Sequence, residues 1–416
     1  MKENDTGERG RALDVSTVWE GLIRKDSGKI IYIVLDGAGG LPDPETGETE
    51  LQSAYTPNLN RLAQESACGL LDIMGPGITP GSGPGHLALF GYDPLRYDPG
   101  RGPLSALGID FDLQEGDVAA RVNFASVDAE GRVTDRRAGR IDTETNLRLC
   151  KRIRETVELD MGGEVFLETV SEHRAVLVLR GPQLGGNLKD TDPQETGTPP
   201  FDPEPQDQES RKTADAVRSF IRQAGEVLAG EEQANAVLLR GFRQYAPLPS
   251  LESRFGLQGV CVARYPMYRG LSRLLGLDVP PAPESFEDAF QSLERLYERS
   301  YTFYFLHIKK TDSTGEDGSF DRKAKVFESV DALIPQVANH VRDVLVVTAD
   351  HSTPARMASH SWHPVPVMIR APYARVDSVQ AFHEEACLHG SLGMRPGLHL
   401  MGLALAHTGK LRKFGA

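Results

Sequence analysis

The sequence has 416 residues, 39% hydrophobic and 25% charged, which is typical of a soluble globular protein too long for one ordinary core. The formal net charge of −13 argues against a broad nucleic-acid surface, because phosphate backbones require basic patches. No apolar run approaches the roughly 20 residues of a membrane span, and the N-terminus has no apolar signal core. The four cysteines are far apart in sequence and form no CxxC pair. We expect a cytoplasmic protein with reduced cysteines that binds neither nucleic acid nor membranes; nothing in the sequence indicates an oligomeric state.

The chain opens with a polar segment that contains one short amphipathic helix, VSTVWEGLIRK, at residues 15–25. Residues 29–40, KIIYIVLDGAGG, form a continuous β-branched run that ends in Asp36-Gly37. Such a run is typical of a strand buried on both faces of a parallel sheet. The following TPNLNRLAQESA predicts a helix with Thr56 as its N-cap and Pro57 as its first residue. Strand, loop and helix in this order indicate a βα unit.

The same pattern returns near the end of the chain. Residues 301–312 and 343–354 each contain a buried strand followed by polar residues, and residues 322–341 have helical periodicity. Residues 364–372, PVPVMIRAP, predict one more strand. Strands that alternate with helices at both ends of the chain predict one doubly wound α/β domain built from both ends.

The middle of the chain has a different pattern. Residues 116–141 alternate apolar and polar side chains between Gly-rich turns, which predicts an antiparallel sheet exposed on one face. Residues 187–210, rich in Pro and acid, predict a long loop or hinge, and residues 213–230 predict a helix with Thr213 as its N-cap. We therefore expect an N-terminal extension at 1–28, an α/β domain at 29–111 and 261–416, and a smaller inserted α+β domain at 112–260.

Polar residues gather at the ends of the predicted strands. In an open α/β sheet, ligands bind beyond the carboxyl ends of the strands, where distant segments of the chain meet. Carboxylates mixed with imidazoles suit divalent metals such as Mn²⁺, Co²⁺ or Zn²⁺. Taken singly, Asp36-Gly37 also fits an ordinary turn, and His360 a surface histidine. His307 and Lys309 share one face of their strand, which suggests support of the site. The candidates are Asp36, Asp312, Glu316, Asp350, His351 and His360.

Ser82 lies in the stretch ITPGSGPGHLALFGYDP, residues 78–94. Gly81, Gly83 and Gly85 would let the backbone approach a phosphate closely, and a helix starting near HLALF would point free N–H groups at it. A serine in this position can act as a nucleophile whose alkoxide a metal stabilises. A plain Gly/Pro-rich turn is the alternative. The stretch matches neither a P-loop nor a dinucleotide-binding fingerprint.

Arginines of the inserted segment could supply a local positive charge for an anionic substrate. The planar guanidinium fork bonds carboxylates and phosphates bidentately. Solvated surface charge is the alternative for any one of them. The candidates are Arg136, Arg137 and Arg140 in DRRAGR, and Arg121, Arg174 and Arg240 at strand-like positions.

Several of these stretches together resemble the archaeal-type cofactor-independent phosphoglycerate mutases, which belong to the alkaline phosphatase superfamily. The matching stretches occur in order from about Lys29 to Ala416: VLDGAGG, TPNLNRLA, ITPGSGPGHLALFGYDP, ARVNFASVD, DRRAGR, HIKKTD, ADHSTP, HSWHPVPVMI and KFGA. The resemblance implies an alkaline-phosphatase-like sheet domain with an inserted substrate-binding or lid domain, two divalent metals and a phosphoserine intermediate.

The resemblance also assigns roles to residues. It implies that Asp36, Ser82, Asp350 and His351 hold one metal, that Asp312, Glu316 and His360 hold the other, and that Ser82 is the nucleophile. Mn²⁺ is the expected metal, with Co²⁺, Mg²⁺ or Zn²⁺ as alternatives. The implied substrate-binding residues are Arg121, Asn123, Arg136, Arg137, Arg140, Arg174, Arg240, Arg269 and Lys309.

The sequence departs from the family pattern at three positions. Glu316 stands where the family has His in an Asp-x-x-x-His pattern, Gly83 where Asp often follows the nucleophile, and Arg269 where many members have Lys. Because Glu also ligates Mn²⁺, we interpret the site as a variant metal site.

The function that we predict is the interconversion of 3-phosphoglycerate and 2-phosphoglycerate, in glycolysis and gluconeogenesis, without 2,3-bisphosphoglycerate. The substrate would be a small phosphorylated three-carbon acid. Two alternatives stay open. One is a metal-dependent phosphomonoesterase or another phosphomutase with the same fold. The other is a non-catalytic metabolite-binding relative that has lost its second metal through Glu316.

Overall fold

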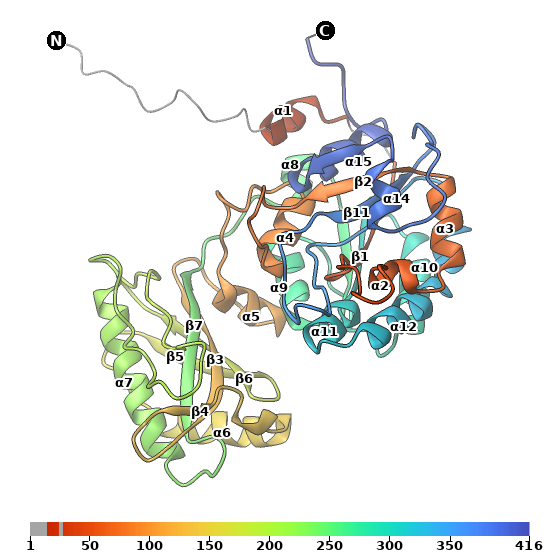
Figure 1. Ribbon diagram of the computed structural model, residues 1–416. Coiled ribbons are helices and arrows are strands. Elements are labelled where there is room, and N and C mark those ends of the chain that lie inside the picture. The colour runs from red at the N-terminus through yellow and green to blue at the C-terminus, as the bar shows by residue number, and fades with distance from the viewer. Residues whose placement is uncertain (1–14, 25–27, 416) are drawn as a thin grey trace, which may run out of the picture. The chain divides into compact units, whose positions relative to one another are not determined.

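A seven-stranded sheet forms the centre of the first of two compact units (Figure 1). The computed structural model describes residues 15–24 and 28–415. In pairing order the strands are β12 (Gly393–Pro396), β2 (Ala67–Asp72), β11 (Val365–Arg370), β10 (Val344–Thr348), β1 (Ile30–Leu35), β9 (Phe303–Ile308) and β8 (Gly259–Val262). Only β11 runs against the others. The predicted runs are confirmed as strands: β1, β9 and β10 are buried along their whole length, as sequences without polar alternation require.

Helices cover both faces of this sheet (Figure 1), which confirms the doubly wound α/β class. One group consists of α2 (Glu50–Ser53), α3 (Pro57–Gln64), α10 (Phe286–Tyr297), α12 (Phe320–Asp331) and α13 (Ile334–Ala338). The other consists of α1 (Val15–Leu22), α4 (Ser82–Leu89), α8 (Leu251–Phe255), the 3-10 turn η2 (Gly397–His399) and α15 (Leu400–His407). The short helices α11 (Lys310–Glu316) and α14 (Glu384–Leu388) complete this unit among the described residues.

The predicted N-terminal helix is present as α1 and packs on the first unit. Trp19 lies against Gly402, where an added Cβ would come within 2.2 Å of the indole ring. Arg254 donates from Nε to Glu20 at 2.6 Å and from Nη2 to the Ser16 hydroxyl at 2.9 Å. Residues 15–22 are therefore part of the unit and not a separate extension; residues 1–14 and 25–27 of that prediction lie outside the described residues.

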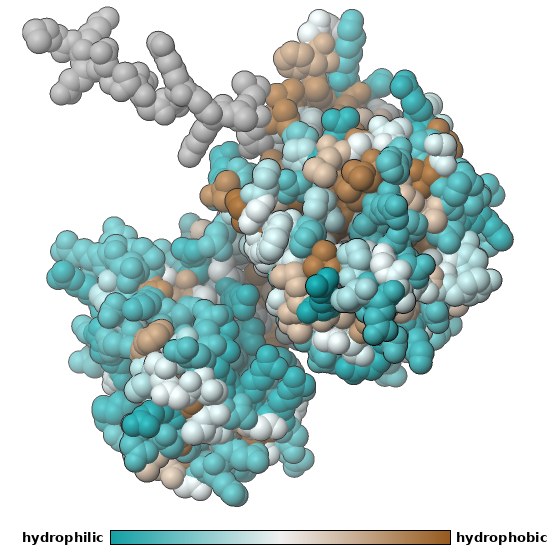
Figure 2. Space-filling model, in the orientation of Figure 1, coloured by the Kyte–Doolittle hydropathy of each residue, from teal (hydrophilic) through white to brown (hydrophobic). Residues whose placement is uncertain are grey.

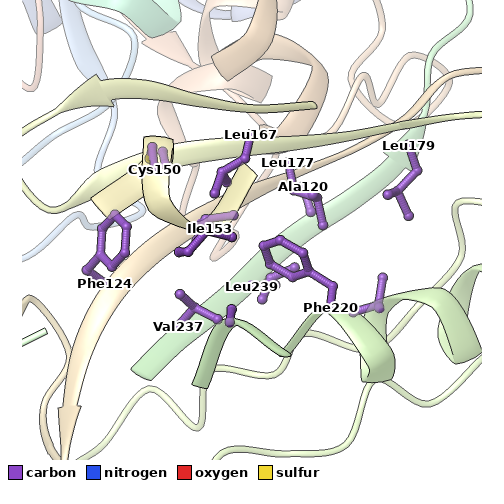
Figure 3. Packing of buried hydrophobic residues seen from close by; sticks show 14 of the residues in the cluster. Ala120, Phe124, Cys150, Ile153, Leu167, Leu177, Leu179, Phe220, Val237 and Leu239 are labelled. Carbon is purple, nitrogen blue, oxygen red and sulfur yellow. The ribbon is translucent and has the colours of Figure 1, made fainter. Parts of the chain in front are cut away.

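The second unit is an antiparallel sheet with its apolar core on one face. The strands are β3 (Val118–Val127), β4 (Val133–Asp135), β5 (Glu164–Ser171), β6 (Arg174–Arg180) and β7 (Ala236–Gln244), with the 3-10 turn η1 (Ala138–Arg140) after β4. Alternate residues of β3 such as Phe124 face helices α6 (Thr143–Thr156) and α7 (Arg211–Leu228). Figure 3 shows Phe124, Ile153 and Phe220 converging in this core. The alternation of apolar and polar residues over 116–141 therefore corresponds to a sheet with one apolar face and one polar face, as predicted.

The boundaries of the second unit lie earlier than the predicted 112 and 260. It comprises Pro99–Leu248 and also Tyr265–Leu275, so that α5 (Arg101–Gly108) and α9 (Pro266–Leu274) belong to it. Both helices approach neighbouring backbone through glycines. A Cβ on Gly102 would lie 2.1 Å from Ala119 O, and one on Gly270 would lie 2.1 Å from Leu104 O. A glycine has no side chain that a sequence pattern could show as apolar, so this packing of α5 and α9 could not be predicted.

Two local predictions need correction. Helix α7 begins at Arg211 after Ser210, and Thr213 is buried inside it, so Thr213 is not the N-cap. Residues 187–210 form a loop but not a hinge, because they lie wholly within the second unit. Thr191 donates its backbone N–H to Leu239 O at 2.9 Å, and Asp192 is buried in an ion pair with Arg136.

The surface and the cysteines agree with the composition. The four cysteines are all buried, and none of them forms a disulfide. Over the residues that the structure describes, no helix is both long and apolar enough to cross a membrane. On the face drawn in Figure 2, hydrophilic residues cover most of the second unit.

Candidate metal centre

The predicted ligands converge at one edge of the large sheet. Asp36 follows β1, Asp350 and His351 follow β10, and Asp312 lies in α11 directly after β9. His360 precedes β11, but because β11 is antiparallel its start lies at the same edge as the ends of the others. The carboxyl ends of parallel strands are where α/β folds bind ligands.

Asp36, Asp350 and His351 form the first group of candidate ligands. His351 Nε2 lies 3.4 Å from Asp36 Oδ1 and 3.2 Å from Asp350 Oδ2, and all three side chains are fully buried. Their ligand atoms lie within 4.8 Å of one another. Asp350 Oδ2 accepts no hydrogen bond of normal geometry from any described residue, although His86 Nδ1 is 3.1 Å away. Buried carboxylates close to an imidazole, one with an unused oxygen, fit a divalent cation.

Asp312, His351 and His360 form the second group, again within 4.8 Å. The two imidazole rings are stacked with centroids 3.7 Å apart, and His360 Nε2 lies 3.4 Å from Asp312 Oδ1. Burial lowers the pKa of His360, but Asp312 outweighs it and raises the pKa to about 9. A metal ion binding there must therefore displace a proton at neutral pH.

Glu316 lies beside this second group rather than within it. Its Oε1 is 3.9 Å from His360 Nε2, and its side chain is 55% exposed. It ends helix α11, so a change of rotamer is enough to move its carboxylate relative to Asp312.

The Thr353 hydroxyl selects the tautomer of His351. It donates to Asp312 Oδ1 at 2.6 Å, and because a hydroxyl has one proton it must accept from His351 Nδ1 at 3.0 Å. The lone pair of His351 is thereby on Nε2, the atom nearest Asp36 and Asp350. Burial lowers the pKa of His351, which keeps the ring neutral. A neutral imidazole whose other ring nitrogen donates a hydrogen bond is the form that ligates metals.

Lys309 compensates the negative charge of the two aspartates. Its Nζ is 3.2 Å from Asp36 Oδ2 and 2.5 Å from Asp312 Oδ2. Burial raises the pKa of Asp36, but the Lys309 ammonium and the hydrogen bond with His307 outweigh it and hold that pKa well below its usual range. His307 supports Asp36 through a 2.9 Å contact between Nε2 and Oδ2. The carboxylates are therefore ionised and available to a cation.

Ser82 is the first residue of α4, and its Oγ lies 3.2 Å from His351 Nε2. The helix presents its first N–H groups beside this hydroxyl. The structure shows a packing role for one of the neighbouring glycines. A Cβ on Gly85 would lie 2.4 Å from Asp350 O, so Gly85 lets α4 pack on the loop that carries the ligands, whereas Gly81 has room for a side chain.

A cavity of about 590 Å³ adjoins this centre within the first unit. Lys309, Lys310 and Arg264 contribute positive groups to its lining, and Ser285 and Ser313 contribute hydroxyls. Arg264 is not among the site residues predicted from the sequence. Its position just after β8, at the same edge of the sheet, was the available signal.

The second unit brings several predicted arginines onto one sheet face. Arg121 pairs with Arg240 across β3 and β7, and Asn123 pairs with Arg174 across β3 and β6, on the face opposite the apolar core. Burial lowers the pKa of Arg121 to about 10, with Arg174, Arg101 and Arg240 acting in the same direction. The buried Nε–H groups of Arg174 and Arg240 donate no hydrogen bond to a described residue. Arg174 Nη1 donates to Glu172 at 3.2 Å and Arg240 Nη1 lies 3.4 Å from Asp192, but cations crowded in this way are suited to a further anion.

The other predicted arginines differ in their surroundings. Arg136 is held by a bidentate ion pair with Asp192, both contacts measuring 2.8 Å. Arg137 and Arg140 are exposed. Burial lowers the pKa of His173 to about 3, and Arg174, Arg121, Arg137 and Arg140 act in the same direction. Arg269 lies on α9. Arg101, at the start of α5, was missed because it is separated from the other arginines in sequence.

Residues 63–234 match the model of a family described as 2,3-bisphosphoglycerate-independent phosphoglycerate mutase. Two relatives, each described as a probable 2,3-bisphosphoglycerate-independent phosphoglycerate mutase, cover 97% of this chain and 100% of their own. The protein from Thermus thermophilus is 48% identical, and that from Deinococcus radiodurans is 47% identical.

Two solved structures have similar folds. A protein from Pyrococcus horikoshii is 29% identical with a TM-score of 0.80, covering 94% of this chain and 100% of its own. The cofactor-independent phosphoglycerate mutase of Thermoplasma acidophilum is 30% identical with a TM-score of 0.66, covering 91% and 99%. The full-length identity to the curated relatives shows that this chain belongs to the 2,3-bisphosphoglycerate-independent phosphoglycerate mutases.

Proposed function

We propose that the enzyme interconverts 3-phosphoglycerate and 2-phosphoglycerate through a phosphoserine at Ser82, beside two divalent metal ions. The observation that carries the proposal is the meeting of Ser82 with two overlapping groups of candidate ligands. Ser82 Oγ lies 3.2 Å from His351 Nε2, and His351 belongs to both groups. A nucleophile at the centre of a two-metal arrangement is the requirement for phosphoryl transfer to a side chain.

The donor set fits two hard or borderline cations. Asp36, Ser82, Asp350 and His351 are assigned to one, and Asp312, Glu316 and His360 to the other. Mn²⁺ suits these mixed oxygen and nitrogen donors best, with Co²⁺, Mg²⁺ or Zn²⁺ as alternatives. Bound metal ions would lower the pKa of the serine hydroxyl and neutralise the charge of the phosphate oxygens.

In the proposed reaction, Ser82 Oγ forms a bond to the substrate phosphorus while the bond from phosphorus to the glycerate oxygen breaks. The serine hydroxyl loses its proton, and the departing glycerate oxygen gains one. The second hydroxyl of the same glycerate then attacks phosphoserine and releases Ser82. Lys309 and Arg264 provide positive charge in the lining of the adjoining cavity, and the phosphoserine must be kept from water.

The arginines of the second unit are assigned to the anionic groups of the substrate. Arg121, Asn123, Arg174 and Arg240 share one face, and the crowding of their charges favours an anion. Arg136 is assigned a supporting role because its fork is already engaged with Asp192. Arg137, Arg140 and Arg269 complete the assignment.

The test is an enolase-coupled assay with 3-phosphoglycerate and Mn²⁺, in the absence of 2,3-bisphosphoglycerate. We expect turnover with the phosphate retained in organic form. Release of inorganic phosphate as the main product would identify a phosphomonoesterase instead, and binding of the substrate without turnover would identify a non-catalytic relative.

Glu316→Ala is expected to weaken binding of one of two metal ions and to reduce the rate by tenfold or more, roughly 1.4 kcal/mol. The physical reason is the loss of a carboxylate close to His360, which itself contacts Asp312. Metal titration by calorimetry, together with the coupled assay, measures both effects. Glu316→His should retain activity and shift the metal preference towards Co²⁺ or Zn²⁺, because imidazole is the softer donor.

Asp317→Ala is the matched control, since Asp317 is the next residue and is exposed. It should bind two ions and turn over at the wild-type rate. If Glu316→Ala behaves in the same way, Glu316 is not a ligand, and the second ion is held by other groups.

Arg121→Met is expected to raise KM for 3-phosphoglycerate by about tenfold or more, with a smaller effect on kcat, because it removes a ground-state contact with an anion. Arg132→Met removes an equal charge from the exposed turn between β3 and β4 and should leave KM unchanged. Equal KM values for the two variants would remove Arg121 from the binding site.

A further inference from the structure

Lys323 is a lysine on α12 whose side chain is completely buried behind the candidate metal centre. Its Nζ donates to Gly39 O at 3.1 Å and to Thr353 O at 2.8 Å. These carbonyls belong to two different loops. Gly39 lies three residues after Asp36, and Thr353 lies two residues after His351, so one ammonium group joins the loops that carry ligands from β1 and β10.

The backbones of the two loops are in direct contact where they cross. Thr353 donates its backbone N–H to Gly39 O at 3.0 Å, and Ser352 forms irregular bridges with Ala38 and Gly39. A Cβ on Gly39 would lie 1.8 Å from the Ser352 hydroxyl. The regular pairing of β1 with β10 ends at Val34 and Thr348, so these contacts and Lys323 set the loop spacing beyond the strands.

Thr353 transmits this spacing to the ligands. Its carbonyl is held by Lys323, and its hydroxyl contacts Asp312 Oδ1 at 2.6 Å and His351 Nδ1 at 3.0 Å. A displacement of the Thr353 backbone would therefore move a contact to each of the two ligand groups at once. Metal-binding residues are typically sensitive to such outer contacts.

Glu50 provides the counter-charge for Lys323. Its Oε1 lies 4.0 Å from Lys323 Nζ and accepts from Ala355 N–H at 2.6 Å, and its side chain is fully buried. A Cβ on Gly40 would lie 1.9 Å from Glu50 Oε2, so a glycine is needed for the carboxylate to sit there. Burying an ion pair of this kind costs desolvation free energy and stabilises a fold only weakly. The pair is therefore better explained by a role in positioning the two loops.

We propose that Lys323 is a positioning residue for the metal centre: by bonding Gly39 O and Thr353 O together, it sets the spacing of the two ligand-bearing loops, while Glu50 balances its charge. The inference rests on the proposed two-metal function. A lysine that only balanced Glu50 would need no contact with either loop.

The experiment measures binding of Mn²⁺ alone to the full-length protein by titration calorimetry, with thermal unfolding followed in parallel. In Lys323→Met the dissociation constant for Mn²⁺ should rise by about tenfold or more, and kcat should fall with KM little changed. Lys325→Met, on the exposed side of the same helix, removes the same charge and should bind Mn²⁺ as the wild type does.

The double variant Glu50→Gln/Lys323→Met separates positioning from charge balance. It no longer buries an unpaired carboxylate, so its melting temperature should recover towards that of the wild type, but its Mn²⁺ affinity should stay about tenfold weaker or more. Wild-type Mn²⁺ affinity in the double variant would overturn the inference and leave Lys323 as a counter-ion only. Failure of the wild-type protein itself to bind Mn²⁺ would instead overturn the proposed metal centre, and this inference with it.

Discussion

Replacing Ser82 with alanine is expected to reduce mutase activity by roughly a thousandfold or more, which corresponds to about 4 kcal/mol of barrier. The alanine variant has no atom that can form the bond to phosphorus. Folding should be unaffected, because among the described residues the Ser82 hydroxyl makes a single side-chain hydrogen bond, with His351 at 3.2 Å. The coupled assay measures the rate, and the melting temperature reports the fold.

A second readout identifies the intermediate itself. Wild-type enzyme quenched in acid during turnover should contain a phosphorylated peptide that includes Ser82, and the alanine variant should not. Ser329→Ala is a suitable control because Ser329 is exposed on α12 and bonds only within its helix. Ser82→Ala activity within about tenfold of the wild type would remove the phosphoserine from the mechanism.

Removal of divalent metal is expected to abolish activity, and Mn²⁺ or Co²⁺ should restore it. Asp36, Asp312 and Asp350 are buried together and Lys309 contacts two of them, so loss of the cations leaves an excess of buried negative charge. The metal-free protein should also melt at a lower temperature, since an ion present at 100 times its dissociation constant stabilises the fold by about 2.7 kcal/mol. Elemental analysis should give two ions per chain before chelation.

The control for this experiment is protein dialysed in parallel without chelator, which should keep both its ions and its rate. Full activity in a sample that elemental analysis shows to be free of metal would exclude the two-metal proposal. One ion per chain with full activity would reduce the proposed centre to a single metal ion.

The large sheet and most of the candidate ligands could be predicted because their signals are local. A strand buried on both faces must be apolar throughout, so β1, β9 and β10 are visible as runs, and the polar residues that follow them mark one edge. His360 is different, because it precedes its strand. Only the antiparallel direction of β11, which the letters PVPVMIRAP do not encode, brings it to that edge.

The contacts behind the ligands could not be predicted, because they depend on side chains that meet only after folding. Lys323 looks like any charged residue of an amphipathic helix, yet it is fully buried. Thr353 is an ordinary polar residue of the stretch ADHSTP. Its hydroxyl selects the tautomer of His351 because its one proton goes to Asp312. Likewise, the positions of Gly102 and Gly270 in the sequence do not predict that α5 and α9 pack by backbone contact.

The path of the chain between its two units has a practical consequence for dissecting the enzyme. The chain passes from one unit to the other at 98/99, 248/249, 264/265 and 275/276. A fragment cut at 99 and 248 would therefore lack α9, and α5 would expose the surface on which Gly270 and Arg273 now pack. An independently folding second unit would have to include both segments, with a designed linker in place of residues 249–264 joining residue 248 to residue 265.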